Sequence, residues 1–312
     1  MNDVKVKTAE LPVIDISSLY TGEEDAFSIV GNKIVCACET FGFFYLSGYD
    51  IPKEKIDFWF SLSKRYFKKP LEFKNKNSIE YSNRFQGYEP QTSAESKEAY
   101  VLGPERAQDD PLVLAGEKYH GANAWPDEGA GLDGWRTAMI DQMQSMLELA
   151  RLINRALAVG LGVSKDFFDK RSDDPMYALR LLHYIPQSDE RHGIADHTDW
   201  GALSLLIQGD VPGLEVLMPD GTWSLAAPIE NTMVVNVGEL VARWTNNRLK
   251  ATRHRVRNLS GVDRYSMAFF LDMNHDAVIE PIETCVSNDN PAQYEPIIIR
   301  DFIDLMHKRD YS

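Results

Sequence analysis

The stretch His197-Thr198-Asp199-Trp200-Gly201 decides how the rest of the chain is interpreted. His197 and Asp199 stand two residues apart, and on a β-strand this spacing places both side chains on the same face. An imidazole nitrogen and a carboxylate oxygen would then face one point. Two ligands hold a catalytic metal poorly, so a third ligand must come from elsewhere. The best candidate is His254, which lies much further along the chain.

Two histidines and one carboxylate on one side of a metal leave its other coordination positions open, which is typical of non-haem Fe(II) oxygenases. The pair alone is weak evidence, because surface loops also carry such pairs, and a lone histidine is more often structural. A second pair, Arg264 and Ser266, strengthens the interpretation of these residues as an oxygenase site. On a strand both would face the same interior, one as a planar fork for a carboxylate and one as a hydroxyl donor.

Composition limits the class of protein. The chain has 312 residues, 44% hydrophobic and 26% charged, which is typical of a globular protein with a sizeable core. Its formal net charge of −14 predicts a partner other than nucleic acid or a membrane surface. The three cysteines form no disulfide framework, and we find no targeting segment or membrane-length apolar run. We therefore expect a cytoplasmic protein that acts on a small molecule; the sequence leaves the oligomeric state open.

Hydrophobic periodicity predicts a helical, loop-rich N-terminal region over residues 1–134. We expect strands near residues 11–16 and 41–46, and helices near residues 25–40 and from residue 51 to Pro70. Residues 74–134 are rich in Asn, Ser, Gly, Pro and charge, and we expect mostly loops and short strands there. Arg84, Phe85 and Tyr88 would either line a pocket or lie in packing and surface positions.

The second half of the chain has the pattern of a long helix followed by many strands. Apolar residues at steps of three or four predict an amphipathic helix from Trp135 to about Leu161, within a segment assigned to residues 135–165. Short β-rich runs separated by Pro and Gly turns then indicate a sandwich or jelly roll over residues 175–275. The expected strands are residues 177–184, 202–208, 214–217, 223–225, 233–237, 253–256 and 265–271. Residues 276–312 would add a terminal segment with a helix over 298–308, all within a single folded unit.

With these residues in place, the chain resembles the 2-oxoglutarate and Fe(II)-dependent dioxygenase superfamily, in the branch with isopenicillin N synthase and the plant-type dioxygenases. The ordered set H-x-D, then His, then R-x-S carries the resemblance, which covers nearly the whole chain. Further matching segments are LPVIDISSL, FGFFYLSGYDIP, HTDWGALSLLIQGDVPGLEV, VVNVGELVARWTNNRLKATRHRV and RYSMAFFL.

The resemblance implies a mainly β fold, with a distorted double-stranded β-helix (jelly roll) core and a helical N-terminal region around it. His197, Asp199 and His254 would bind Fe(II), and Arg264 and Ser266 would bind the far carboxylate of 2-oxoglutarate. The implied enzyme uses O2 to hydroxylate, desaturate or cyclise a small metabolite, while 2-oxoglutarate is decarboxylated to succinate. The protein would supply geometry and exclude water.

The chain departs from the family at one segment. Plant-type members carry an Asn-Tyr-Tyr-Pro run where this chain has His183-Tyr184-Ile185-Pro186. The tyrosine that often touches the co-substrate aligns with Ile185, so Tyr184 either replaces that contact or only packs. His183 is a possible acid or base, but a hydrogen-bonded strand histidine is the favoured interpretation.

Substrate identity is the least constrained part. The hydrophobic edge of the site is predicted to include Phe85, Leu182 and Phe270, while Arg84 and Arg180 would anchor an anionic group. We therefore expect a small, polar, carboxylate-bearing metabolite. Three alternatives stay open: an iron oxidase of the same fold that does not use 2-oxoglutarate, a zinc hydrolase, and a non-catalytic binding protein on the same scaffold.

Overall fold

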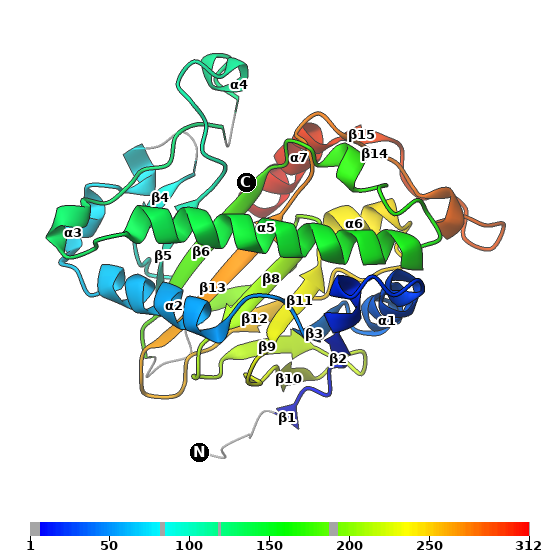
Figure 1. The fold of residues 1–312 in the computed structure, drawn as a ribbon, viewed down its shortest axis with the longest axis horizontal. Coiled ribbons are helices and arrows are strands. Elements are labelled where there is room, and N and C mark those ends of the chain that lie inside the picture. Colours follow the sequence, from blue (N-terminus) through cyan, green and yellow to red (C-terminus); the bar gives the residue numbers. More distant parts are fainter. Residues whose placement is uncertain (1–6, 82–84, 118–119, 187–192, 312) are drawn as a thin grey trace.

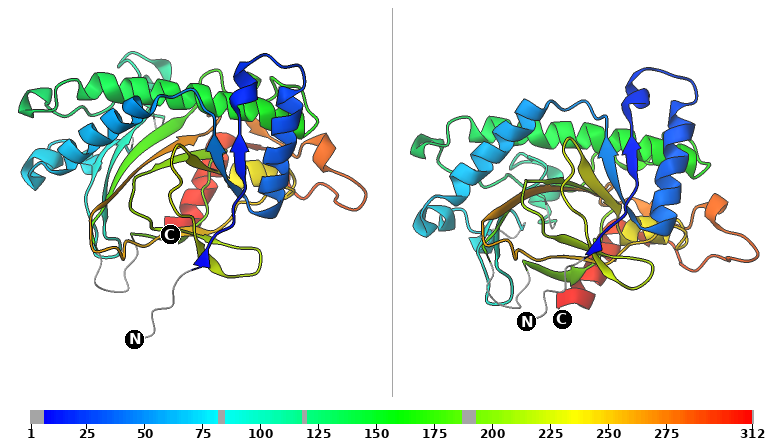
Figure 2. Two further views of the ribbon diagram at one scale, coloured as in Figure 1. Left: turned by 60° about the horizontal axis from the view of Figure 1, so that its bottom comes forward. Right: turned by 90° about the horizontal axis from the view of Figure 1, so that it is seen from below.

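Two β-sheets that face each other form the centre of the molecule. The computed structural model describes residues 7–81, 85–117, 120–186 and 193–311. The large sheet has the strand order β2-β3-β11-β8-β13-β6-β5-β4, and the smaller sheet the order β1-β10-β9-β12-β7. Figure 2 shows the smaller sheet on one side of the large sheet and the long helices on the other.

The strands of the large sheet are β2 (Val13–Asp15), β3 (Phe43–Ser47), β11 (Met233–Val237), β8 (Leu203–Gln208), β13 (Arg264–Leu271), β6 (Tyr177–Tyr184), β5 (Lys97–Leu102) and β4 (Gly87–Glu89). Those of the smaller sheet are β1 (Lys7–Thr8), β10 (Trp223–Leu225), β9 (Leu214–Leu217), β12 (His254–Val256) and β7 (Ile194–His197). A separate two-stranded pair joins β14 (Val278–Ile279) and β15 (Ile297–Ile298). Segments far apart in the sequence are therefore neighbours in each sheet.

Three long helices, α1 (Ala26–Thr40), α2 (Lys53–Phe67) and α5 (Trp135–Gly160), lie along the outer face of the large sheet. The other helices are α3 (Leu71–Asn75), α4 (Pro111–Leu114), α6 (Glu239–Trp244) and α7 (Ile299–Tyr311). Figure 1 shows α5 running across the strands, with α2 and α1 beside it. The apolar residues of α5 at steps of three or four are buried, as an amphipathic helix on a sheet requires: Met139, Met143, Met146, Leu149, Ile153 and Leu157.

Alternation along the strands separates the core into two parts. Leu181 of β6 and Met267 of β13 are paired and pack on the helix side of the large sheet. Their neighbours Leu182 and Ala268 belong to a second apolar cluster, which also includes Val216 of the smaller sheet. Because successive side chains of a strand point to opposite faces, alternate residues of β6 and β13 face the space between the sheets.

The structure confirms the predicted fold class, a mainly β molecule with a double-stranded β-helix core and surrounding helices. The strand predicted for residues 177–184 is β6, and the helix predicted from Trp135 ends at Gly160. The sequence analysis missed β5 as a distinct strand and α6 as a helix. That residues 1–312 fold as one unit, with the internal boundaries given above, stays a prediction. None of the described helices is long and apolar enough to cross a lipid bilayer.

Candidate metal centre and co-substrate site

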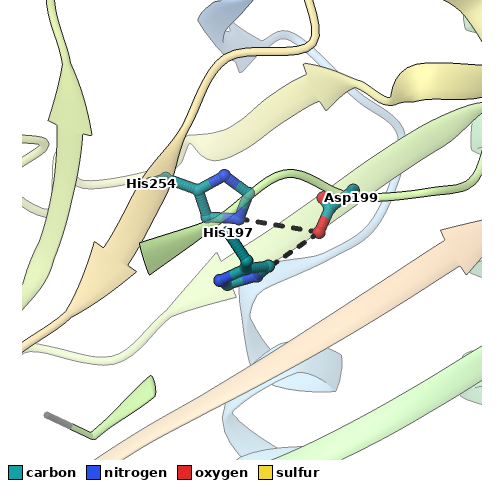
Figure 3. A group of neighbouring side chains, drawn as sticks. All are labelled: His197, Asp199 and His254. Carbon is teal, nitrogen blue, oxygen red and sulfur yellow. Dashed lines mark ion pairs between the residues drawn. The ribbon is translucent and has the colours of Figure 1, made fainter. Parts of the chain in front are cut away.

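Three side chains from separate segments converge between the two sheets. His197 ends β7, Asp199 follows it, and His254 begins β12, which pairs directly with His197. Nε2 of each histidine lies 3.6 Å from Oδ1 of Asp199. One nitrogen or oxygen atom of each of the three residues lies within 4.8 Å of the others (Figure 3). The described residues hold no other such group of histidine, cysteine and acidic side chains.

Each histidine is fixed by a bond on its outer side. Nδ1 of His197 lies 2.8 Å from the carbonyl oxygen of Ala195, and Nδ1 of His254 lies 3.1 Å from that of Thr252. A carbonyl oxygen only accepts, so both Nδ1 atoms donate, and in the neutral imidazole Nε2 keeps the lone pair that faces Asp199. This is the tautomer that a metal ion needs when Nε2 is the ligand.

Two side chains hold the outer oxygen of Asp199. Ser204 donates to Oδ2 at 2.5 Å, and the amide nitrogen of Asn236 donates to the same oxygen at 2.7 Å. Oδ1 is left to face the two histidines. These bonds orient the carboxylate in the way that partners of metal ligands commonly do.

Protonation in the triad suits a cation. Burial raises the pKa of Asp199, but the interactions of the carboxylate with the two histidines outweigh this effect, so the pKa falls below its usual value. Burial also lowers the pKa of His254, although the charge of Asp199 opposes this effect. An ionised carboxylate beside a neutral imidazole is the donor set that a divalent metal requires.

One premise of the sequence analysis was wrong. His197 is the last residue of β7, so Asp199 lies beyond the strand and not on it. The two side chains still converge, because the segment after β7 folds back and is held by Ser204 and Asn236. His197 is also more open than Asp199: 37% of its side chain is exposed, against 8% for the carboxylate residue.

Arg264 and Ser266 share the inner face of β13, as predicted. Arg264 is fully buried, and its guanidinium contacts Ser266 Oγ at 3.4 Å, the Gln208 side-chain oxygen at 3.3 Å and the Val211 carbonyl at 3.2 Å. Burial lowers the pKa of Arg264, and Tyr184 partly offsets this effect. Three neutral acceptors around a buried cation leave its charge without a carboxylate among the described residues, which favours an anionic ligand.

Tyr184 and His183 have opposite orientations. Tyr184 pairs with Arg264 across the strands, and its ring lies 4.7 Å from the guanidinium carbon. His183 faces the helix side, where its ring stacks on Tyr265 at 4.5 Å and Nδ1 lies 2.8 Å from Glu98 Oε1. The favoured interpretation of His183, a hydrogen-bonded strand histidine, agrees with these contacts.

The residues predicted to contact substrate fall into two groups. Arg180, Leu182 and Phe270 all lie on the inner face of β6 and β13. Phe85 is 45% exposed and stands apart from them, with its ring 5.5 Å from that of His307 on α7. Arg84 lies outside the described residues.

A charged group next to Arg180 was missed by the sequence analysis. Arg180 forms an ion pair with Glu89 of β4. Lys97 of β5 lies 2.6 Å from the other oxygen of Glu89 and 3.3 Å from Glu95. Glu95 in turn accepts a bond from the backbone nitrogen of Ala195 at 3.2 Å, two residues before the first histidine of the triad. No spacing in the sequence signals this group, because it depends on the pairing of β4, β5 and β6.

The C-terminal helix α7 also reaches the segment that carries Asp199. Asp310 accepts a bond from the indole nitrogen of Trp200 at 2.7 Å. Arg309 makes bonds of 2.7 and 2.9 Å to Glu239, which also accepts from the Thr198 hydroxyl. The helix was predicted, but its contact with the residues on either side of the triad carboxylate was not.

Comparison with known proteins places this geometry in a family. Residues 176–273 match the model of the 2OG-Fe(II) oxygenase superfamily, and residues 11–128 match that of the non-haem dioxygenase in morphine synthesis N-terminal region. The 2-oxoglutarate-Fe(II) type oxidoreductase hxnY of Emericella nidulans is 33% identical over 96% of this chain and 90% of its own length. The 2-oxoglutarate-dependent dioxygenase tropC of Talaromyces stipitatus is 35% identical over 88% of this chain and 89% of its own.

Solved structures agree with this result. A full-length Neurospora crassa protein, crystallised in complex with alpha-KG, superimposes with a TM-score of 0.86 at 30% identity, covering 98% of this chain and 99% of that one. A 2OG-Fe(II) oxygenase family protein from Caulobacter crescentus gives 0.85 at 28% identity, covering 97% and 100%. The chain therefore belongs to the 2OG-Fe(II) oxygenase superfamily, and it is a 2-oxoglutarate-dependent non-haem iron dioxygenase that uses Fe(II), 2-oxoglutarate and O2 to oxidise a small metabolite.

Proposed function

We propose that His197, Asp199 and His254 are the iron ligands of this enzyme, and that Arg264, Ser266 and Tyr184 bind the far carboxylate of 2-oxoglutarate. The convergence of two Nε2 atoms and one carboxylate oxygen carries the proposal. The bound ferrous ion would supply the reaction of O2 with 2-oxoglutarate that gives succinate and carbon dioxide and oxidises the substrate.

The surrounding side chains support this assignment of roles. Three ligands from one side leave the remaining coordination positions for the co-substrate, O2 and water. Arg264 offers a planar fork that matches a carboxylate in both geometry and charge. Its burial between Tyr184 and Gln208 excludes water, which strengthens an ion pair with a dicarboxylate.

The substrate would lie over the inner face of β6 and β13, with Arg180, Leu182 and Phe270 below it. Structures of the same Neurospora crassa protein contain thymine and 5-formyluracil, which supports a small-molecule substrate for this chain too. The expectation of a carboxylate-bearing substrate rested on Arg84, outside the described residues, and on Arg180, whose charge is balanced by its acidic partner on β4. A carboxylate-bearing substrate stays a prediction from the sequence, and the ion pair at Arg180 does not favour it.

The test combines iron content with product formation. We expect Asp199→Ala and His254→Ala to lose bound iron and all succinate release while they keep the wild-type circular dichroism spectrum. His275→Ala is the matched control, because this histidine lies away from the triad with Glu117 as its partner. Full iron content in Asp199→Ala would refute the ligand assignment.

The co-substrate is tested separately. Arg264→Ala should raise the 2-oxoglutarate concentration needed for half-maximal succinate release and leave the iron content unchanged, with Arg264→Lys in between. Substrate oxidation without stoichiometric succinate would instead support an oxidase of the same fold. Iron that exchanges for zinc without loss of turnover would support a hydrolase.

The cellular setting is also a proposal. All three cysteines are free thiols, which supports the cytoplasm or another reducing compartment. The formal net charge of −14 supports a small-molecule partner and not nucleic acid or an anionic membrane. Fractionation of cells that produce the protein, with a thiol-labelling assay on the purified fraction, would test the location.

A further inference from the structure

The ion pair between Arg180 and Glu89 lies on the face of the large sheet that carries the co-substrate site. Arg180 pairs with Ala268 across β6 and β13, two positions from the pair of Leu182 and Ser266. Glu89 pairs with Ala99, which in turn pairs with Leu182. Directly opposed residues of antiparallel strands share a face. The Arg180–Glu89 pair therefore faces the interior between the sheets, as the co-substrate arginine does.

The same pair is close to the metal triad. Lys97 joins Glu89 to Glu95, with contacts of 2.6 and 3.3 Å. Glu95 bonds to the backbone nitrogen of Ala195 on β7, so the group reaches across to the strand that carries His197. The Glu89–Arg180 pair is therefore linked through Lys97 and Glu95 to the strand that ends at His197.

The charges in this group cancel. Arg180 and Lys97 contribute two positive charges, and Glu89 and Glu95 contribute two negative charges. The Lys97 side chain is only 5% exposed, while the side chains of Glu89 and Arg180 are 26% and 30% exposed. Burial raises the pKa of Glu89, but the charges of Arg180 and Lys97 outweigh this effect and lower it to about 2. Glu89 is therefore a permanent carboxylate beside Arg180 at neutral pH.

We propose that the Glu89–Arg180 pair selects a neutral substrate that presents a hydrogen-bond acceptor next to a donor, such as a lactam, an imide or a carboxamide. The acceptor would take a bond from the Arg180 guanidinium, and the donor would give one to Glu89. A substrate carboxylate placed at Arg180 would meet the like charge of Glu89, and a cation placed at Glu89 would meet Arg180. This inference rests on the proposed function, because it places the substrate over the metal triad.

Three ring probes of similar size test the proposal: 2-pyridone as the neutral lactam, benzoate as the carboxylate and benzylammonium as the cation. Their dissociation constants are measured by ligand-detected nuclear magnetic resonance on the enzyme loaded with Fe(II) and 2-oxoglutarate, without O2. No turnover is needed for this measurement. We expect 2-pyridone to bind the wild-type enzyme tighter than either charged probe, by about tenfold or more.

Variants at the pair should shift this preference in opposite directions. Glu89→Gln removes the negative charge of Glu89 beside Arg180, so benzoate should gain about tenfold relative to 2-pyridone. Arg180→Gln leaves Glu89 in excess, so benzylammonium should gain instead. Asp169→Asn is the matched control, because it removes an Arg–carboxylate pair with Arg155 away from the site and should leave the order of the three probes unchanged.

Two results would overturn the inference. One is equal or absent binding of all three probes to the wild-type enzyme, or tighter binding of benzoate. The other is an unchanged probe preference in Glu89→Gln that keeps its melting temperature and its affinity for 2-oxoglutarate. Failure of the proposed function would look different: iron and 2-oxoglutarate would bind independently of the triad and of Arg264, whatever the order of the probes.

Discussion

The carboxylate of Asp199 is oriented by two residues outside the triad, Ser204 and Asn236. Its outer oxygen accepts bonds from Ser204 and Asn236, and only the inner oxygen faces the histidines. We predict that Ser204→Ala and Asn236→Ala each weaken Fe(II) binding by about tenfold or more, because the carboxylate becomes free to rotate. Fe(II) titration under anaerobic conditions measures this effect.

The chain offers a matched control for this prediction. Asn154 on α5 is as fully buried as Asn236, but its side-chain amide has no hydrogen-bond partner among the described residues. Asn154→Ala should leave the iron affinity unchanged. If it weakened iron binding as much as Asn236→Ala does, a general loss of packing, and not carboxylate orientation, would explain both.

Glu89 should make stability depend on pH in the acidic range. Its pKa is about 2 in the folded protein and 4.5 when unperturbed, so the folded state holds fewer protons between these values. The stabilisation is complete above about pH 5 and is lost as the pH falls toward 2; it amounts to about 3 kcal/mol. We predict that the free energy of unfolding, from urea titrations, falls less steeply with acidity in Glu89→Gln. Parallel curves for the two proteins would contradict this.

At the residue scale, the sequence reveals the candidate ligands, but it does not reveal the residues that hydrogen-bond to them. The candidate ligands and the R-x-S pair could be found because short fixed spacings and a family resemblance point to them. Ser204 and Asn236 could not, because they come from β8 and β11, and nothing in either strand marks its position opposite Asp199.

The crossing of α1 and α5 depends on two glycines, a feature of whole elements. A Cβ at Gly31 would lie 2.1 Å from the carbonyl oxygen of Ala156 and 2.9 Å from the nitrogen of Gly160, both backbone atoms of α5. We predict that Gly31→Ala lowers the free energy of unfolding by about 1–3 kcal/mol, since the helices must separate. Chemical denaturation measures the loss. Ser28→Ala, on the exposed side of the same helix, is the control and should change stability little.

Elements with a clear periodicity could be predicted from the sequence, and those with paired charges could not. Regular apolar steps identify α5, and short hydrophobic runs between turns identify β6 and β13. The strand β5 was missed because it begins with Lys97 and Glu98, which look like surface residues. Both are buried in the fold, where Lys97 meets Glu89 and Glu98 meets Lys74. Such pairing across strands cannot be inferred from one segment.

At the scale of the whole molecule, the triad links the two sheets to a segment between them. His197 and His254 come from the smaller sheet, while Ser204 and Asn236 of the large sheet hold Asp199. A metal that binds all three should therefore stabilise the entire fold. We predict that Fe(II) raises the melting temperature and that 2-oxoglutarate raises it further. Each ligand should stabilise the folded state by about 2.7 kcal/mol when its free concentration is a hundred times its dissociation constant.

Variants separate the two contributions to this thermal shift. Asp199→Ala should lose the response to Fe(II), and Arg264→Ala should keep the response to Fe(II) but lose most of the response to 2-oxoglutarate. A chelator should return the wild-type protein to its metal-free melting temperature. Identical shifts in all three proteins would mean that the ligands bind elsewhere.

The alternation along β6 and β13 has a practical meaning for anyone who wishes to redirect this catalyst. Even-numbered positions such as Arg180, Leu182, Ala268 and Phe270 point toward the reactive space, whereas their odd-numbered neighbours support α5. A mutational library restricted to these four positions would leave Arg264, Ser266 and Tyr184 in place and spare the residues that pack on the helices. Natural variation can follow the same division: residues on the inner face can change with the substrate, while residues on the helix side are kept because the fold depends on them.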